Sequence, residues 1–151
     1  TLTDVIARCC QIKSEVVCQD ETETGLRAIL NFGHTIGHAI EAISGYGKLL
    51  HGEAVSIGQV AAARISGRLI GLMPDSVHRI ENIFRAAGLP TRMNFTKAKF
   101  LKLLDAMHLD KKVSGGEIHF VLAEQIGKVR WGEKVPVKLM EEVLLARDTK
   151  S

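Results

Sequence analysis

The sequence has few cysteines, no long uncharged run and little excess charge, and each shortage excludes a class of protein. The three cysteines are odd in number and lack the C-x-x-C spacing of zinc modules, which indicates reduced thiols in a cytoplasmic protein. We expect these thiols to be core or half-buried: Cys9, Cys10 and Cys18. No uncharged run reaches membrane-spanning length, and no charged-then-apolar leader opens the chain. The sequence therefore predicts neither a membrane partner nor a disulfide scaffold.

The charge balance is mild. Twenty Lys and Arg residues against 17 Asp and Glu residues give a formal net charge of +3. This is too small an excess to indicate a nucleic-acid-binding protein, although a local site for an anionic substrate remains open. The 151 residues suffice for one domain with a real core, and no repeat, low-complexity tract or linker divides them. We therefore predict a single domain over 1–151.

Apolar periodicity predicts a mainly α fold, a multi-helical domain with a small β-hairpin late in the chain. The second long helix is small and apolar at almost every position and should be buried on most sides. The predicted helices cover residues 2–18, Gly25–Ile43, Glu53–Leu69, a stretch from an Asp75/Ser76 cap to Gly88, Thr96–Asp110 with Thr96 as cap, and Pro136–Arg147, and the hairpin covers Glu117–Glu133.

The stretch "LRAILNFGHTIGHAIEAI" places two histidines four residues apart among apolar side chains. On a wheel of about 100° per residue, its polar residues fall within an arc of roughly 80°, and Glu23 joins them if the helix starts early. These residues are Arg27, Asn31, His34, His38 and Glu41. A solvated face normally carries Lys, Glu and Gln, whereas a guanidinium, an amide and two imidazoles hold anions, hydroxyls and metals. The pattern favours a functional cleft over a plain surface.

Two metal-binding arrangements are open from these residues. His34 and His38 could chelate zinc at i and i+4, but H-T-I-G-H lacks the glutamate that serves as the base in H-E-x-x-H metalloproteases. Alternatively, "LLHGEAV" places His51 just before the next helix, and a helix-loop-helix pair can bring His51 to His34.

Three motifs together resemble the C-terminal domain of bacterial 3-dehydroquinate synthase. They are "ETETGLRAILNFGHTIGHAIEA", "LLHGEAVSIG" and "LDKKVSGGEIHFVLAEQIGKV", and the resemblance extends from about Lys13 to Val129 with the same order and spacing. Family members convert the seven-carbon sugar phosphate 3-deoxy-D-arabino-heptulosonate 7-phosphate to 3-dehydroquinate and phosphate in the shikimate pathway of aromatic amino acid biosynthesis. They use bound NAD and a divalent metal, zinc or cobalt.

The resemblance implies a role for each matching residue. His34 and His51 match two of the three metal ligands. Glu23 and His38 match positions with acid-base roles, and His38 also matches a substrate contact. The other implied substrate contacts are Lys13, Arg27, Asn31 and one of the pair Lys111 and Lys112. Lysine and arginine suit phosphate and carboxylate, and zinc can polarise a secondary alcohol so that hydride leaves to NAD.

The resemblance also implies parts outside this sequence. Family members carry an N-terminal NAD-binding domain, and no G-x-G-x-x-G-like stretch lies here between a strand and a helix. The family's third metal ligand, a glutamate, would precede Thr1. We therefore expect the isolated chain to be inactive, and the complete enzyme to be a cytoplasmic homodimer that acts on a small sugar phosphate.

Other readings of the motifs remain open. Related sugar-phosphate cyclases and metal-dependent polyol dehydrogenases share the metal layout or the two-domain plan, although "NFGHTIGHAIE" followed by "HGEAV" favours dehydroquinate synthase. A non-catalytic helical binding module that retains these residues is the third hypothesis.

Overall fold

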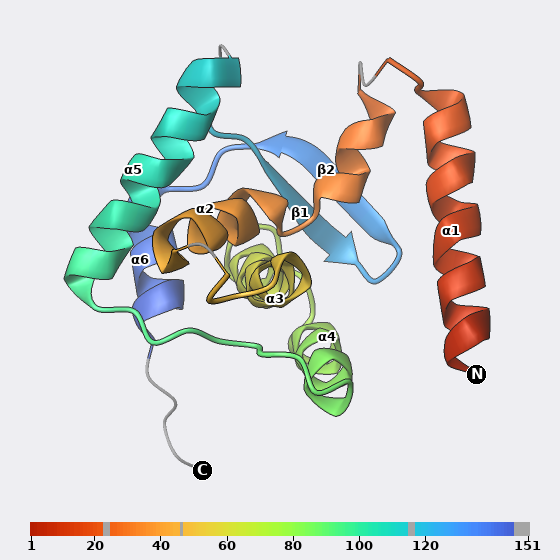
Figure 1. The fold of residues 1–151 in the computed structure, drawn as a ribbon, viewed down its shortest axis with the longest axis horizontal. Coiled ribbons are helices and arrows are strands. Elements are labelled where there is room, and N and C mark those ends of the chain that lie inside the picture. The colour runs from red at the N-terminus through yellow and green to blue at the C-terminus, as the bar shows by residue number, and fades with distance from the viewer. Residues whose placement is uncertain (23–24, 46, 115–116, 147–151) are drawn as a thin grey trace. The chain divides into compact units, whose positions relative to one another are not determined.

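The computed structural model describes residues 1–22, 25–45, 47–114 and 117–146, without the side chains of 110–114. The chain forms two compact units, Thr1–Asn31 and Phe32–Ser151. Helices dominate both units, and the described ranges contain one two-stranded antiparallel sheet, late in the chain (Figure 1). The predicted fold class, mainly α with a late hairpin, is confirmed.

The first unit begins with helix α1 (Leu2–Gln19). Thr1 caps it: the Asp4 N–H donates to the Thr1 hydroxyl oxygen at 3.3 Å, while the Asp4 carboxylate accepts from the Thr1 amino group at 2.6 Å. Val16 is the only buried residue of the helix. The expectation of core or half-buried thiols is wrong, because Cys9, Cys10 and Cys18 are all exposed. A unit of this size is too small to enclose a core around one long helix.

A buried carboxylate organises the chain after α1. Asp20 is 7% exposed, and its Oδ2 accepts hydrogen bonds from the backbone N–H groups of Gly25 (2.9 Å) and Arg27 (2.8 Å). These bonds satisfy N–H groups that have no partner at a helix start. A short 3₁₀ helix, η1 (Leu26–Asn31), follows.

The prediction of one helix over Gly25–Ile43 is wrong, since η1 ends at Asn31 and a new helix, α2 (His34–Ser44), begins after Gly33. Gly33 has φ +78°, a left-handed conformation that glycine adopts without steric cost. The predicted alignment of Arg27 and Asn31 with the histidines on one helix face is therefore wrong, because it requires an unbroken α-helix through these residues.

Glycines set the crossing of α2 with helix α3 (His51–Leu69) in the second unit. A Cβ added at Gly58 would collide with the Gly33 carbonyl oxygen, and one added at Gly33 would collide with the backbone N of Gln59. One added at Gly37 would lie 3.0 Å from the Cα of Val55. The two backbones thus approach closely at a crossing that leaves no room for side chains.

Helix α3 lies at the centre of the second unit (Figure 1). Four elements pack against it: α2, α4 (Pro74–Ala86), α6 (Val137–Leu145) and β1 (Phe120–Gln125). As predicted, its small and apolar residues are mostly buried. It begins at His51 rather than at the predicted Glu53, because the Glu53 carboxylate accepts the Leu50 N–H at 2.8 Å and closes a turn before it.

Helix α4 (Pro74–Ala86) begins one residue before the predicted cap, so the assignment of Asp75 or Ser76 as cap is wrong. Met73 occupies the cap position without a side-chain bond, and Pro74 supplies the fixed φ suited to a first helical residue. In contrast, the predicted cap Thr96 is confirmed, since its hydroxyl accepts the Lys99 N–H at 3.2 Å. Helix α5 (Lys97–Ser114) continues beyond the predicted end at Asp110.

The hairpin pairs β1 (Phe120–Gln125) with β2 (Lys128–Glu133), and helix α6 (Val137–Leu145) follows. Strand β1 is tied to α3 through Ser66, whose Oγ accepts the Ala123 N–H at 2.9 Å and donates to the Ala62 carbonyl at 2.7 Å. The largest fully buried apolar side chains form the core between these elements: Ile36, Ile40, Val60, Ile65, Phe100, Leu103 and Leu122.

Candidate metal centre

Three histidines converge where α2 and α3 begin. His34 is the first residue of α2, His38 follows one turn later, and His51 is the first residue of α3. The ring centroids are 5.4 Å apart for His34 and His38, 5.5 Å for His38 and His51, and 5.9 Å for His34 and His51. One ring nitrogen of each histidine lies within 4.8 Å of the other two. The arrangement can hold a metal ion after small side-chain adjustments, because imidazole nitrogens bind zinc at about 2.0–2.1 Å.

The surroundings of His34 lower its pKa and so favour the form that can bind a cation. Burial lowers its pKa, and the neighbouring His38 and His51 lower it further when they are protonated. The backbone carbonyl of Phe32 opposes this effect without reversing it. The lowered pKa favours the neutral form of His34, which is the form that binds a metal.

The second ring nitrogens distinguish the three histidines. The Nδ1 of His34 is 3.3 Å from the carbonyl oxygen of Phe32, and the Nδ1 of His51 is 3.0 Å from Oε2 of Glu41. Both acceptors require a proton on Nδ1, so the lone pair in each neutral ring is on Nε2. Within the described part of the chain, His38 makes ring contacts but no hydrogen bond through a ring nitrogen.

Glu41 is the contact that the sequence did not assign. The sequence pattern puts Glu41 on the polar stripe with the histidines but predicts no role for it. Its position three residues after His38 on the same helix was the available signal, but its pairing with His51 depends on the loop between α2 and α3, whose path the sequence pattern does not fix.

The other predicted site residues belong to the first unit or lie outside the description. Lys13 and Asn31 are exposed, and Arg27 is half-buried with its guanidinium donating to the Glu21 carbonyl at 3.2 Å. Glu23 and the side chains of Lys111 and Lys112 lie outside the described residues. The structure thus brings together His34, His38 and His51.

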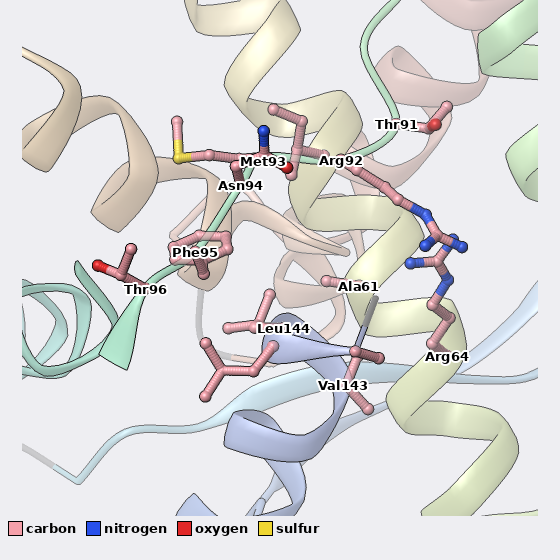
Figure 2. Close-up of a pocket in the computed structure, with 13 residues that line it drawn as sticks. Ala61, Arg64, Thr91, Arg92, Met93, Asn94, Phe95, Thr96, Val143 and Leu144 are labelled. Carbon is pink, nitrogen blue, oxygen red and sulfur yellow. The ribbon is translucent and has the colours of Figure 1, made fainter. Parts of the chain in front are cut away.

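A pocket of about 370 Å³ lies elsewhere in the second unit, between α3, the segment after α4, and α6. Figure 2 shows the guanidinium groups of Arg64 and Arg92 together at one end of it, with Phe95 and Leu144 among the apolar residues of the opposite part. None of its lining residues belongs to the histidine cluster.

The arginines of this pocket belong to an ion network around Glu81, which is 7% exposed. Its carboxylate lies 2.6 Å from Arg64, 2.8 Å from Arg85 and 3.6 Å from Arg92. Burial alone would raise the pKa of Glu81, but the Arg64 hydrogen bond and the positive charges of the three arginines outweigh it and lower the pKa. The sequence pattern does not predict this network, because Glu81 has no local signature beyond Arg85 one turn later.

Comparison with known proteins assigns the family. The model of the family described as "3-dehydroquinate synthase C-terminal" matches residues 1–113. The chain belongs to this family. A 3-dehydroquinate synthase from Nitrosospira multiformis is 48% identical over 144 residues, and one from Shewanella loihica is 49% identical over 144 residues. These alignments cover 95% of this chain, but only 38% and 40% of the two relatives.

A solved structure shares the fold. It is a 2-epi-5-epi-valiolone synthase from Streptomyces hygroscopicus with NAD+ and Zn2+ bound, with a TM-score of 0.81 at 24% identity over 95% of this chain and 39% of that one. Among the described residues, no helix of this chain is both long enough and apolar enough to cross a membrane.

Proposed function

We propose that this chain is the C-terminal, metal- and substrate-binding domain of a 3-dehydroquinate synthase. The complete enzyme would convert 3-deoxy-D-arabino-heptulosonate 7-phosphate to 3-dehydroquinate and phosphate. The observation that carries the proposal is the convergence of three histidines in a chain of this family. Because the chain spans about two fifths of its relatives' length, the remaining part of the enzyme would supply the nucleotide site.

The donor set fits a divalent ion, since it consists of imidazoles and burial lowers the pKa of His34, which favours its neutral form. His34 and His51 would hold the ion through Nε2, because their Nδ1 atoms already have acceptors. A glutamate from outside this sequence would complete the set, as the family resemblance implies. When bound, zinc or cobalt would polarise a secondary alcohol of the substrate, and NAD would accept the hydride. The NAD+ and Zn2+ in the structural neighbour support this choice of cofactors.

His38 would transfer protons rather than bind the ion. It is exposed, lies beside both proposed ligands, and has neither of its ring nitrogens fixed by a described hydrogen bond. An imidazole in this state can accept a proton from a substrate hydroxyl at one nitrogen and release it at the other. Glu23 would share the acid-base work.

The remaining residues would bind and orient the anionic substrate. Lys13 and Arg27 suit its phosphate or carboxylate, Asn31 suits its hydroxyls, and one of Lys111 and Lys112 would add a further cation. We further propose that the complete enzyme is a cytoplasmic homodimer, and that its partner is a small sugar phosphate rather than nucleic acid or a membrane.

The test joins this chain to the N-terminal part of the Nitrosospira multiformis relative, which is 48% identical to it over the shared region. With NAD, zinc and the seven-carbon substrate, we expect the fusion to release phosphate and form 3-dehydroquinate, and the 151-residue chain alone to do neither. Sedoheptulose 7-phosphate serves as the competing substrate. A folded fusion that turns over only sedoheptulose 7-phosphate, or neither substrate while the intact relative is active, would contradict the proposal.

A further inference from the structure

We propose that Glu41 is a positioning residue for His51. Glu41 holds the His51 imidazole in the Nδ1–H tautomer, so that its Nε2 faces the metal. The inference rests on the proposed function, because His51 is a ligand only if the site binds a divalent ion. Glu41 is the one acidic side chain that the described residues place in hydrogen-bond contact with the histidine cluster.

The contact fixes a proton. Oε2 of Glu41 lies 3.0 Å from Nδ1 of His51. An ionised carboxylate only accepts hydrogen bonds, so Nδ1 must donate and must carry the hydrogen in the neutral ring. The lone pair then lies on Nε2, at the opposite side of the imidazole. Carboxylate–histidine–metal arrangements of this kind fix ring orientation and make the ligand nitrogen more basic.

Glu41 stands behind the ligand rather than beside it. The group of side chains whose ligand atoms all lie within 4.8 Å of one another consists of His34, His38 and His51, and it does not include Glu41. The backbone carbonyl of Phe32 has the same relation to His34. Each proposed ligand therefore has an acceptor for its Nδ1 hydrogen.

The contact between Glu41 and His51 contributes little to the stability of the fold. The side chains of His51 and Glu41 are 55% and 43% exposed, and pairs at such exposure add little to stability. Arg68 and Glu142 form a pair of the same length, 3.0 Å, with exposures of 52% and 49%. Neither belongs to the group of possible metal ligands found among the described residues. Glu142 is thus a matched control for a carboxylate whose only role is a surface pair.

The first measurement needs no metal. Long-range 1H–15N NMR spectra of the metal-free chain at pH 8 report which ring nitrogen of each neutral histidine carries the hydrogen. We expect the Nδ1–H form of His51 to predominate, to be retained in Glu41→Gln, whose amide oxygen can still accept, and to be lost in Glu41→Ala. Glu142→Ala should leave the His51 spectrum unchanged.

The second measurement titrates the chain with zinc against a chelator of known affinity. We expect Glu41→Ala to weaken zinc binding by about 10–100-fold, the usual effect of losing such a partner. Glu41→Gln should weaken it less, because orientation is kept and only the charge is lost. Glu142→Ala should bind zinc as the unaltered chain does.

The outcomes separate the two proposals. If Glu41→Ala binds zinc as tightly as Glu142→Ala, or if His51 keeps its Nδ1–H form in Glu41→Ala, the positioning role is wrong even though the metal centre stands. If His34→Ala leaves zinc binding unchanged, the metal centre itself is wrong. A loss of zinc in His34→Ala together with the expected loss in Glu41→Ala supports both.

Discussion

Helix α3 contributes to two groups of ionisable side chains. The groups differ in how many of their polar atoms already have hydrogen-bond or ion-pair partners. At its first residue, the histidine cluster is half-buried to exposed, and His38 keeps both ring nitrogens without a described hydrogen bond. Farther along, Arg64 and two other arginines surround Glu81, whose carboxylate is almost fully buried. Ring nitrogens without a hydrogen-bond partner are suited to metal binding and proton transfer, whereas charges that are paired with one another hold helices and loops together.

The histidine cluster and the Glu81 network should therefore have different roles, one in binding and one in stability. Changes in the histidine cluster should alter metal binding and turnover with little effect on folding, and changes in the Glu81 network should do the reverse.

The largest effect should come from His34→Ala. Removing this proposed ligand should abolish turnover in the fusion protein and weaken zinc binding of the chain at least about 100-fold, since few ligands remain. Thermal unfolding monitored by circular dichroism should be nearly unchanged without metal, because the one hydrogen bond that His34 makes to a described residue goes to the backbone of Phe32. A large drop in the unfolding temperature of His34→Ala with zinc affinity preserved would show that His34 stabilises the fold and does not bind the metal.

Glu81→Ala should lower the free energy of unfolding by about 3 kcal/mol, the lower end for breaking a buried ion pair. Arg64 would be left 20% exposed without its carboxylate. Zinc affinity should stay within about threefold. The control, Glu142→Ala, removes an exposed pair and should cost about 0.5 kcal/mol or less. Equal destabilisation by the two substitutions in urea titrations would show that the network is only a surface feature.

His38→Ala should slow turnover of the fusion protein about 100-fold, within the range expected for a lost acid-base group. Zinc should remain bound, because His34 and His51 keep their ligand nitrogens. Metal analysis of His34→Ala and His38→Ala decides the assignment: equal zinc loss in both would favour chelation by the i, i+4 pair on α2.

Gly58→Ala should connect the two readouts by disturbing the helix crossing. Its added methyl group would collide with the Gly33 carbonyl, so α2 must shift away from α3. We expect a loss of about 2 kcal/mol in unfolding free energy, typical of overpacking, together with weaker zinc binding. Gly52→Ala is the control, since a Cβ there meets no atom within 4 Å. A Gly58→Ala variant as stable as Gly52→Ala would contradict the close crossing.

The sequence was informative where the signal is periodic or local. Helix α3, the hairpin and the Thr96 cap follow from apolar spacing and turn chemistry that neighbouring residues determine. The break before α2 could not be read in this way, because "NFGHT" continues the apolar period. Gly33 combines a positive φ with a close approach to the backbone of Gln59 on α3, which is a contact between distant segments.

The same distinction holds for the site. His34 and His38 share a face because four residues separate them on a helix. The motif "LLHGEAV" indicated His51, but its partner Glu41 depends on how the α2–α3 loop returns the chain. The Glu81 network joins α3, α4 and the segment after α4, and no sequence spacing encodes such a meeting.

The smallest expected effect is a pH dependence from Glu81. Its folded-state pKa is lowered from the ordinary value of 4.5, so the folded protein binds the proton less readily than the unfolded chain does. The resulting stability is fully present above about pH 4.5 and is lost as the pH falls through the lowered pKa. We expect urea titrations between pH 6 and pH 3 to show a steeper loss of stability for the unaltered chain than for Glu81→Gln.

Salt separates this contribution from the exposed carboxylates. The hydrogen bond from Lys128 lowers the pKa of Glu124 on the hairpin, but this pair faces solvent and should be screened at 0.5 M salt. The Glu81 contribution should persist there, because its side chain is only 9% exposed and salt screens buried charges much less than exposed ones. The control is the loss of stability with falling pH at high salt. If it is the same for Glu81→Gln as for the unaltered chain, Glu81 does not stabilise the fold through its charge. The Glu81 network would then not differ from the histidine cluster in the way proposed.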